Sequence, residues 1–236
     1  MEIINQCFNK ILTIDGISYL VTGLSAKGSN DKPNQDSFGL GYDGKCLIVA
    51  VADGLGSSTH SDVGSRIAVE TTLNILAKYS IQDVWEQIFQ SWSSQIAGPL
   101  NQFDTTCKFV RIDGSKITLG NIGDGWFGMK TCEGYSELKN QNIFTNCTQT
   151  ICSIKDGLSP YFAELGMRDV ESIALSTDGF SEDFDFNSRQ SLLLDMMAEI
   201  SIDDCDIYGD LDNFINNWPI ISNQDDKTII FVGRVS

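Results

Sequence analysis

The sequence predicts a single α+β domain that spans residues 1–236. Several short apolar runs are joined by Asp-Gly or Glu-Gly, which is a typical turn between antiparallel strands. The helical patterns are clustered between these runs, whereas a parallel βαβ fold would have one helix after each strand. A chain of 236 residues is also long enough to bury one sizeable core. We therefore expect antiparallel sheets covered by helices.

The apolar runs predict the strands in order. The central one is Cys46–Asp53, where seven consecutive apolar residues predict a strand that is buried on both faces. Residues 140–159 show no clear period and are expected to form a loop or short strands. The other expected strands are 11–14, 17–21, 37–40, 106–112, 116–122, 126–131, 135–138, 170–177 and 228–235.

Helices are predicted from apolar residues that recur every three or four positions. The first helix is expected at 62–79, where Val63, Ile67 and Ile75 share one face, and Ser61 is its expected N-cap. The remaining expected helices are 82–97, 189–200 and 211–218.

Composition excludes several classes of protein. The net charge of −16 argues against binding to nucleic acid and to anionic membrane surfaces, because both require basic patches. No segment approaches the roughly 20 apolar residues of a membrane span, and the first residues lack a signal-peptide pattern, so we expect a cytoplasmic protein. Seven cysteines without a CxxC pair, beside a single histidine, favour free thiols over a structural zinc site.

Aspartate recurs at the ends of the apolar runs. Three runs end in Asp-Gly, at Asp53, Asp124 and Asp178, and further acids precede expected strands at Asp36 and Asp225. One such residue could simply cap a helix or form a turn. If several converge, each pair at about 4 Å repels by roughly 4 kcal/mol at an effective dielectric constant near 20, so a polyvalent cation is needed. Oxygen ligands favour Mg²⁺ or Mn²⁺, and two such ions could activate water for phosphoryl displacement.

Other catalytic schemes are poorly supplied. His60 is the only histidine, so it would have to serve any Ser-His-Asp or Cys-His site, and it is better explained as a surface or capping residue. Residues 204–215 resemble a calcium loop but carry Ile215 in place of the bidentate glutamate, which favours an acidic approach to a helix over a calcium-binding domain. Asp183 and Asp185 resemble an aspartyl nucleophile pair, yet no apolar strand precedes them, so a surface position is expected.

The acids and their neighbours resemble, in order, the motifs of the metal-dependent (PPM, type 2C) protein phosphatases. The resemblance covers about residues 18–232 and is closest to small stand-alone bacterial members. It implies an αββα sandwich of two packed antiparallel sheets, a metal site at one end, and hydrolysis of phosphoserine and phosphothreonine. It also implies a phosphorylated protein substrate with a cognate kinase, and we expect a monomer. The matching motifs are Asn34-Gln35-Asp36, Asp53-Gly54, Thr105-Thr106, Gly123-Asp124-Gly125, Asp178-Gly179 and Asp225-Asp226-Lys227-Thr228.

The resemblance assigns the metal ligands residue by residue. It implies that Asp53 bridges two Mn²⁺ or Mg²⁺ ions and that the carbonyl group of Gly54 binds one of them. Asp178 and Asp225 are implied as ligands of the other ion. Asp124, together with Asp178, is implied to hold a weaker third ion.

It also implies supporting and catalytic roles. Asp36 and Gln35, which replaces a usual glutamate, would act through metal-bound water, so Asp53, Asp36 and Gln35 are the candidate catalytic residues. Thr105, Thr106 and Thr228 match small residues that support the strands carrying the acids.

Departures from the family pattern leave a second hypothesis open. Asp31 stands where the family often has a phosphate-gripping arginine, and Lys27 or Lys32 is the candidate replacement. Leu55 stands where some members have a histidine. These differences, with Gln35, are also compatible with a regulatory or binding module that has lost catalysis.

Overall fold

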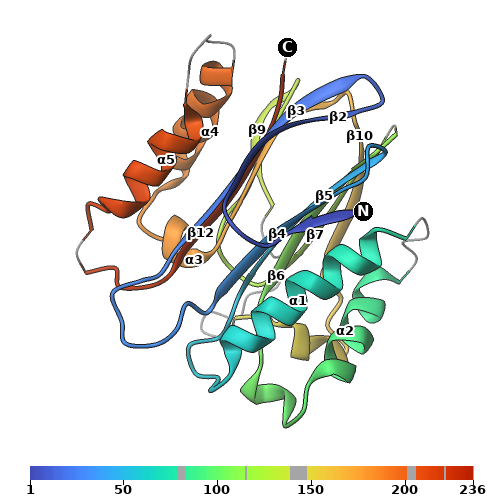
Figure 1. Ribbon diagram of the computed structural model, residues 1–236, viewed down its shortest axis with the longest axis vertical. Coiled ribbons are helices and arrows are strands. Elements are labelled where there is room, and N and C mark those ends of the chain that lie inside the picture. The colour runs from blue at the N-terminus through green and yellow to red at the C-terminus, as the bar shows by residue number, and fades with distance from the viewer. Residues whose placement is uncertain (79–82, 115, 139–147, 201–205, 221, 236) are drawn as a thin grey trace.

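Two six-stranded antiparallel sheets pack face to face, with helices on both outer sides (Figure 1). The computed structural model describes residues 1–78, 83–114, 116–138, 148–200, 206–220 and 222–235. In spatial order the first sheet contains β1 (Glu2–Ile4), β4 (Asp36–Tyr42), β5 (Cys46–Asp53), β6 (Cys107–Asp113), β7 (Lys116–Ile122) and β10 (Tyr161–Gly166). The second contains β2 (Phe8–Ile14), β3 (Ile17–Ala26), β12 (Lys227–Arg234), β11 (Val170–Ser176), β8 (Phe127–Thr131) and β9 (Gly134–Glu137).

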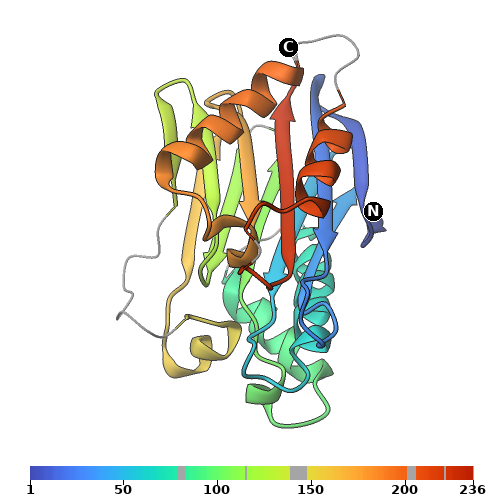
Figure 2. The same ribbon diagram turned by 90° about the vertical axis from the view of Figure 1, so that its left-hand side faces the viewer.

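Helices complete the αββα sandwich, which confirms the expected architecture. The helices α1 (Ser61–Leu76) and α2 (Val84–Gln95) cover the first sheet, and α4 (Phe186–Ile200) and α5 (Ile207–Asn216) lie over the second (Figure 2). Three short helices, α3 (Asp178–Ser181), η1 (Leu100–Gln102) and η2 (Ile151–Asp156), occupy connections. In Figure 1, α3 and the connections β3–β4 and β5–α1 gather at the same end of the sandwich.

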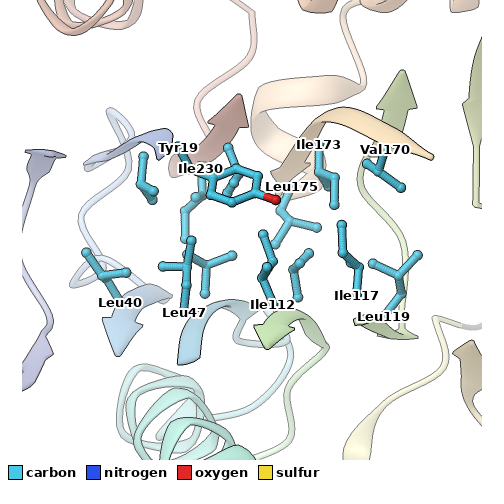
Figure 3. Packing of buried hydrophobic residues seen from close by; sticks show 14 of the residues in the cluster. Tyr19, Leu40, Leu47, Ile112, Ile117, Leu119, Val170, Ile173, Leu175 and Ile230 are labelled. Carbon is cyan, nitrogen blue, oxygen red and sulfur yellow. The ribbon is translucent and has the colours of Figure 1, made fainter. Parts of the chain in front are cut away.

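The central strand β5 is buried on both faces, as predicted. Leu47, Val49 and Val51 point into the core between the two sheets, whereas the alternate residues Ile48 and Ala50 pack against the helices. Figure 3 shows this inter-sheet core as two facing layers, with Leu47 in one layer and residues of the second sheet in the other. Because β5 has no polar face, its first polar side chain, Asp53, lies at the lip of the core.

The expected N-cap of the first helix is wrong. The structure has His60 at the N-cap position of α1, without a side-chain capping bond, and Ser61 is the first helical residue. The hydroxyl group of Ser61 instead accepts a hydrogen bond from the Gln35 side chain. His60 is exposed and its ring packs on Phe103, as expected for a surface residue.

Some short elements gave no clear sequence signal. These are β1, β10, α3 and η2, and the last lies in the range 140–159, of which residues 139–147 are outside the described part. β10 is an edge strand whose residues alternate between half-buried and exposed, so its sequence lacks a strong apolar pattern. The predicted turn at Asp15-Gly16 is confirmed, since both residues have positive φ between the paired strands β2 and β3.

The calcium-like segment and the pair Asp183 and Asp185 are found as the sequence analysis expected. Asp206 caps α5 by accepting a hydrogen bond from the Gly209 amide, so the described part of the calcium-like segment is an acidic helix start, and Asp204 lies outside the described residues. Asp183 and Asp185 are exposed, as expected.

The described cysteines are free, and they are Cys7, Cys46, Cys107, Cys132 and Cys152. Cys147 and Cys205 are outside the described residues. Within the ranges that the structure describes, no helix is long and apolar enough to cross a membrane.

Candidate metal centre

Three Asp-Gly strand ends meet at one end of the sandwich. Asp53 ends β5, Asp124 follows β7, and Asp178 starts α3 directly after β11. Each residue offers a carboxylate oxygen, and these three atoms lie within 4.8 Å of one another. All three residues are half-buried, so the oxygens are accessible but partly shielded from water. A group of hard oxygen donors at this spacing fits a divalent cation such as Mn²⁺ or Mg²⁺.

The other two expected acids flank this cluster. Asp36 opposes Asp53 in the β4–β5 ladder, is 8% exposed, and accepts a 2.8 Å hydrogen bond from the Thr177 hydroxyl group. Asp225 is exposed two residues before β12, and its negative charge acts on Asp178. The structure therefore brings five carboxylates to one end of the molecule, although only three form the tight cluster.

Burial and mutual repulsion raise the pKa values of these acids. Burial, helped by the charge of Asp226, raises the pKa of Asp36 to about 7. Burial and the charges of Asp36 and Asp178 raise the pKa of Asp53 well above its usual range. The pKa of Asp178 is raised as well, chiefly by burial. Since a bound divalent cation would favour the charged form of every one of these groups, the donor set fits such an ion.

Threonines fix the backbone beside Asp53. The hydroxyl group of Thr105 donates to the Asp53 carbonyl at 2.7 Å, and the Asp53 amide donates to the Thr106 hydroxyl group at 3.0 Å. The Thr228 amide donates in turn to Thr177, which holds Asp36. These bonds support the role expected of the threonines, because each one limits the movement of a strand end that carries an acid.

Gly54 allows the helix α1 to approach the cluster. A Cβ atom at this position would lie 2.5 Å from the Ser61 carbonyl oxygen, which is too close for any other residue. Gly54 also donates its amide hydrogen to the Gln35 carbonyl at 3.1 Å, so the residues next to Asp36 and Asp53 are joined.

Asp226 is a structural residue that the sequence analysis did not single out. It is 2% exposed and accepts two backbone hydrogen bonds, from Gly28 at 2.7 Å and from Gln35 at 2.6 Å. These bonds tie the β3–β4 connection to the start of β12. Its neighbour Asp225 stood in the same acidic pair, but only the fold shows that the two side chains separate, one to the surface and one into the interior.

Replacing Asp226 by alanine is expected to lower the free energy of unfolding by about 2–4 kcal/mol, because two partly buried amides would lose their acceptor. Urea unfolding of the metal-free protein measures this change. Asp226→Asn is the matched control, since it keeps one acceptor oxygen and should lose less stability. A loss below about 1 kcal/mol in Asp226→Ala would show that water replaces these bonds.

The two candidate phosphate-binding lysines are exposed on the β3–β4 connection. The Lys27 ammonium group donates to the Asn30 carbonyl at 2.9 Å, and that of Lys32 donates to the Gly56 carbonyl at 2.6 Å. Lys32 therefore reaches across to the loop that follows Asp53, whereas Lys27 is held within its own loop. Asp31, which stands where the family often has an arginine, is exposed.

Lys108 is a second residue that sequence reasoning missed. It lies in β6, is 1% exposed, and its ammonium group donates to the Asp124 carbonyl. The available signal was a lysine between apolar residues, Cys107 and Phe109, two positions after Thr106.

A cavity of about 360 Å³ opens beside Asp124 and Asp178. Trp126 and Phe127 contribute its apolar surface, and Arg189 also lines it. The guanidinium group of Arg189 is paired with Glu137 at 2.8 Å. The cluster is thus bordered by a space large enough for the side chains of a bound peptide.

The fold and this cluster define an αββα sandwich protein with a candidate divalent-metal centre at one end. A family model described as protein phosphatase 2C matches residues 25–206, and the chain belongs to this family. It is thereby a protein-serine/threonine phosphatase, an enzyme of the hydrolase class.

Solved structures show the same fold at low sequence identity. The phosphatase Stp1 from Staphylococcus aureus is 14% identical, with a TM-score of 0.66 over 90% of this chain and 94% of that one. The catalytic domain of the phosphatase PstP, in complex with two manganese ions, is 14% identical, with a TM-score of 0.66 over 93% and 99% of the two chains. RsbX in complex with magnesium is 18% identical, with a TM-score of 0.60 over 96% and 100%. No curated protein matches the sequence significantly.

Proposed function

We propose that this protein hydrolyses phosphoserine and phosphothreonine in proteins at a centre of two divalent ions, with residues 1–236 acting as one phosphatase domain. The observation that carries the proposal is the convergence of Asp53, Asp124 and Asp178 within 4.8 Å in a chain of the protein phosphatase 2C family. The two manganese ions in the PstP structure and the magnesium in that of RsbX support Mn²⁺ or Mg²⁺ as the cofactor.

The proposed ligands follow the geometry of the cluster. Asp53, whose carboxylate is influenced by the charges of both Asp36 and Asp178, would bridge the two ions, with the Gly54 carbonyl as a further ligand of one. Asp178 and Asp225 would be ligands of the other ion, and Asp124 would contribute a further carboxylate from the end of β7. Bound Mn²⁺ or Mg²⁺ would supply a Lewis acid that activates water and compensates the charge of the phosphate group.

The remaining residues would orient water and phosphate. Asp36, fixed by Thr177, would hold an ordered water molecule by its carboxylate group. The side-chain amide nitrogen of Gln35 donates a hydrogen bond to the Ser61 hydroxyl group. This bond would direct the side-chain oxygen of Gln35 towards a second water molecule. Lys32 would attract the phosphate as a point charge, and Lys27 is the alternative from the same loop.

The proposal extends to the setting of the reaction. The substrate would be a phosphorylated protein, supplied by a Ser/Thr kinase, whose residues beside the phosphate enter the cavity next to Asp178. We place the enzyme in a bacterial cytoplasm as a monomer that takes part in signalling. The free cysteines among the described residues support a reducing compartment.

Hydrolysis of para-nitrophenyl phosphate and of phosphoserine and phosphothreonine peptides tests the proposal. We expect turnover with Mn²⁺ or Mg²⁺ and none with Ca²⁺ or EDTA. Tight Mn²⁺ binding without turnover on any of these substrates would contradict catalysis and favour a binding module. A phosphotyrosine peptide is the control for the substrate class.

A further inference from the structure

A buried cation lies on the inner side of the acidic cluster. Lys108 belongs to β6, where it pairs across the sheet with Val51 of β5. Because side chains alternate along a strand, Lys108 shares the inter-sheet face of β6 with Val110 and Ile112, and Ile112 points into this core in Figure 3. A lysine on this face at 1% exposure cannot reach solvent as an ordinary surface lysine does.

The ammonium group of Lys108 is directed at the cluster, since it donates a hydrogen bond to the Asp124 carbonyl. Burial lowers the pKa of Lys108, and the charges of Asp124, Asp53 and Asp178 oppose this fall and so favour the charged ammonium form. The same attraction appears from the other side, since Lys108 opposes the rise in pKa of both Asp53 and Asp178. Lys108 therefore faces the same three carboxylates that could hold a metal ion, but from the protein interior.

Charge neutrality links this lysine to the number of ions. The five acids at this end of the molecule carry five negative charges when ionised, and the two ions of the proposed centre neutralise four of them. In a partly buried site the remaining charge has a high energetic cost unless a partner compensates it. The ammonium group of Lys108 supplies the missing charge, whereas a third divalent ion would give the site an excess of positive charge and be repelled by Lys108.

We propose that Lys108 is a built-in counter-ion of the Asp53–Asp124–Asp178 cluster. Because of its charge, the acids of the site bind one divalent ion fewer than they would bind without it. The inference rests on the proposed metal centre. It predicts that the weaker third ion, which the family resemblance implies for Asp124 and Asp178, is not held by the wild-type protein. Lys108 is thus a positioning residue that sets metal stoichiometry.

The test counts Mn²⁺ ions per chain by electron paramagnetic resonance of free Mn²⁺ during titration. Lys108→Met, of similar length but uncharged, should bind one Mn²⁺ more than the wild type. Lys108→Gln keeps a hydrogen-bond donor without the charge and should gain the same ion. The gain should disappear in the double variant Lys108→Met/Asp124→Asn. Circular dichroism and thermal unfolding with Mn²⁺ check that each variant is folded.

Arg111→Met is the matched control. Arg111 is also a buried cation of β6, 4% exposed, but it lies on the opposite face and pairs with Asp113. Its removal should leave the Mn²⁺ count unchanged. The proposal is overturned if the Lys108 variants match the wild type in ion number and in affinity within about twofold. Absence of Mn²⁺ binding in the wild type would instead contradict the metal centre, and with it this inference.

Discussion

Replacing Asp178 by asparagine is expected to reduce Mn²⁺-dependent hydrolysis of para-nitrophenyl phosphate on the order of 10³-fold or more, since a charged ligand is lost where phosphate charge must be compensated. The fold should be preserved, because the Asp178 side chain also accepts a hydrogen bond from the Gly179 amide at 2.7 Å, and asparagine can still accept it. Initial rates under saturating Mn²⁺ measure the effect, and thermal unfolding of the variant checks its fold.

Asp156→Asn is the matched control for this variant. Asp156 is an exposed aspartate at the end of η2, so its replacement removes the same charge away from the cluster. Its rate should stay within about twofold of the wild type. If Asp178→Asn kept more than a tenth of the wild-type rate, the proposed ligand role of Asp178 would be wrong.

The stability of the metal-free protein is expected to decrease as the pH rises. In the metal-free protein, folding raises the pKa of Asp36 to about 7, and it raises those of Asp53 and Asp178 too. The folded state therefore holds protons that the unfolded chain releases near pH 4. This contribution to stability is complete below about pH 4 and is lost as the pH rises towards about 7. We expect the melting temperature of the metal-free protein to fall between pH 5 and pH 8.

Bound Mn²⁺ should reverse this trend, because the ion competes with protons for the same oxygens. At a concentration 100-fold above its dissociation constant, one ion stabilises the folded state by about 2.7 kcal/mol, or roughly 5–10 °C for a domain of this size. We expect this full shift near pH 8 and a smaller one at pH 5. Differential scanning fluorimetry across this pH range, with Mn²⁺ or EDTA, measures both curves.

Two variants separate the cluster from the general effect of a net charge of −16. Asp36→Asn removes one titrating group and should flatten the decline of the metal-free protein. Asp210→Asn changes an exposed residue of α5 and should leave the decline as it is in the wild type. Equal pH dependence in these two variants would mean that the buried acids are not the source of the trend.

Much of the fold could be predicted from local patterns. The run Cys46–Asp53 has no polar face, and this alone required a strand that is covered on both sides. The turn at Asp15-Gly16 similarly defined a hairpin, because few dipeptides adopt that backbone geometry so readily. Edge elements such as β10 were missed, since a strand with one neighbour and an exposed face needs little apolar patterning.

The candidate site, like the fold, could be predicted only in part from the sequence. The sequence by itself determined which acids stand at strand ends. An apolar run followed by Asp-Gly ends a buried strand at Asp53, and the same pattern marks the connection that begins at Asp178. Only the tertiary structure decided which of them meet, and it placed Asp226 and Lys108 beside them. Both are buried charged groups whose partners come from distant segments, and no local pattern encodes such partners. Their positions follow from the packing of two sheets, which brings strand ends far apart in the chain to one lip of the core.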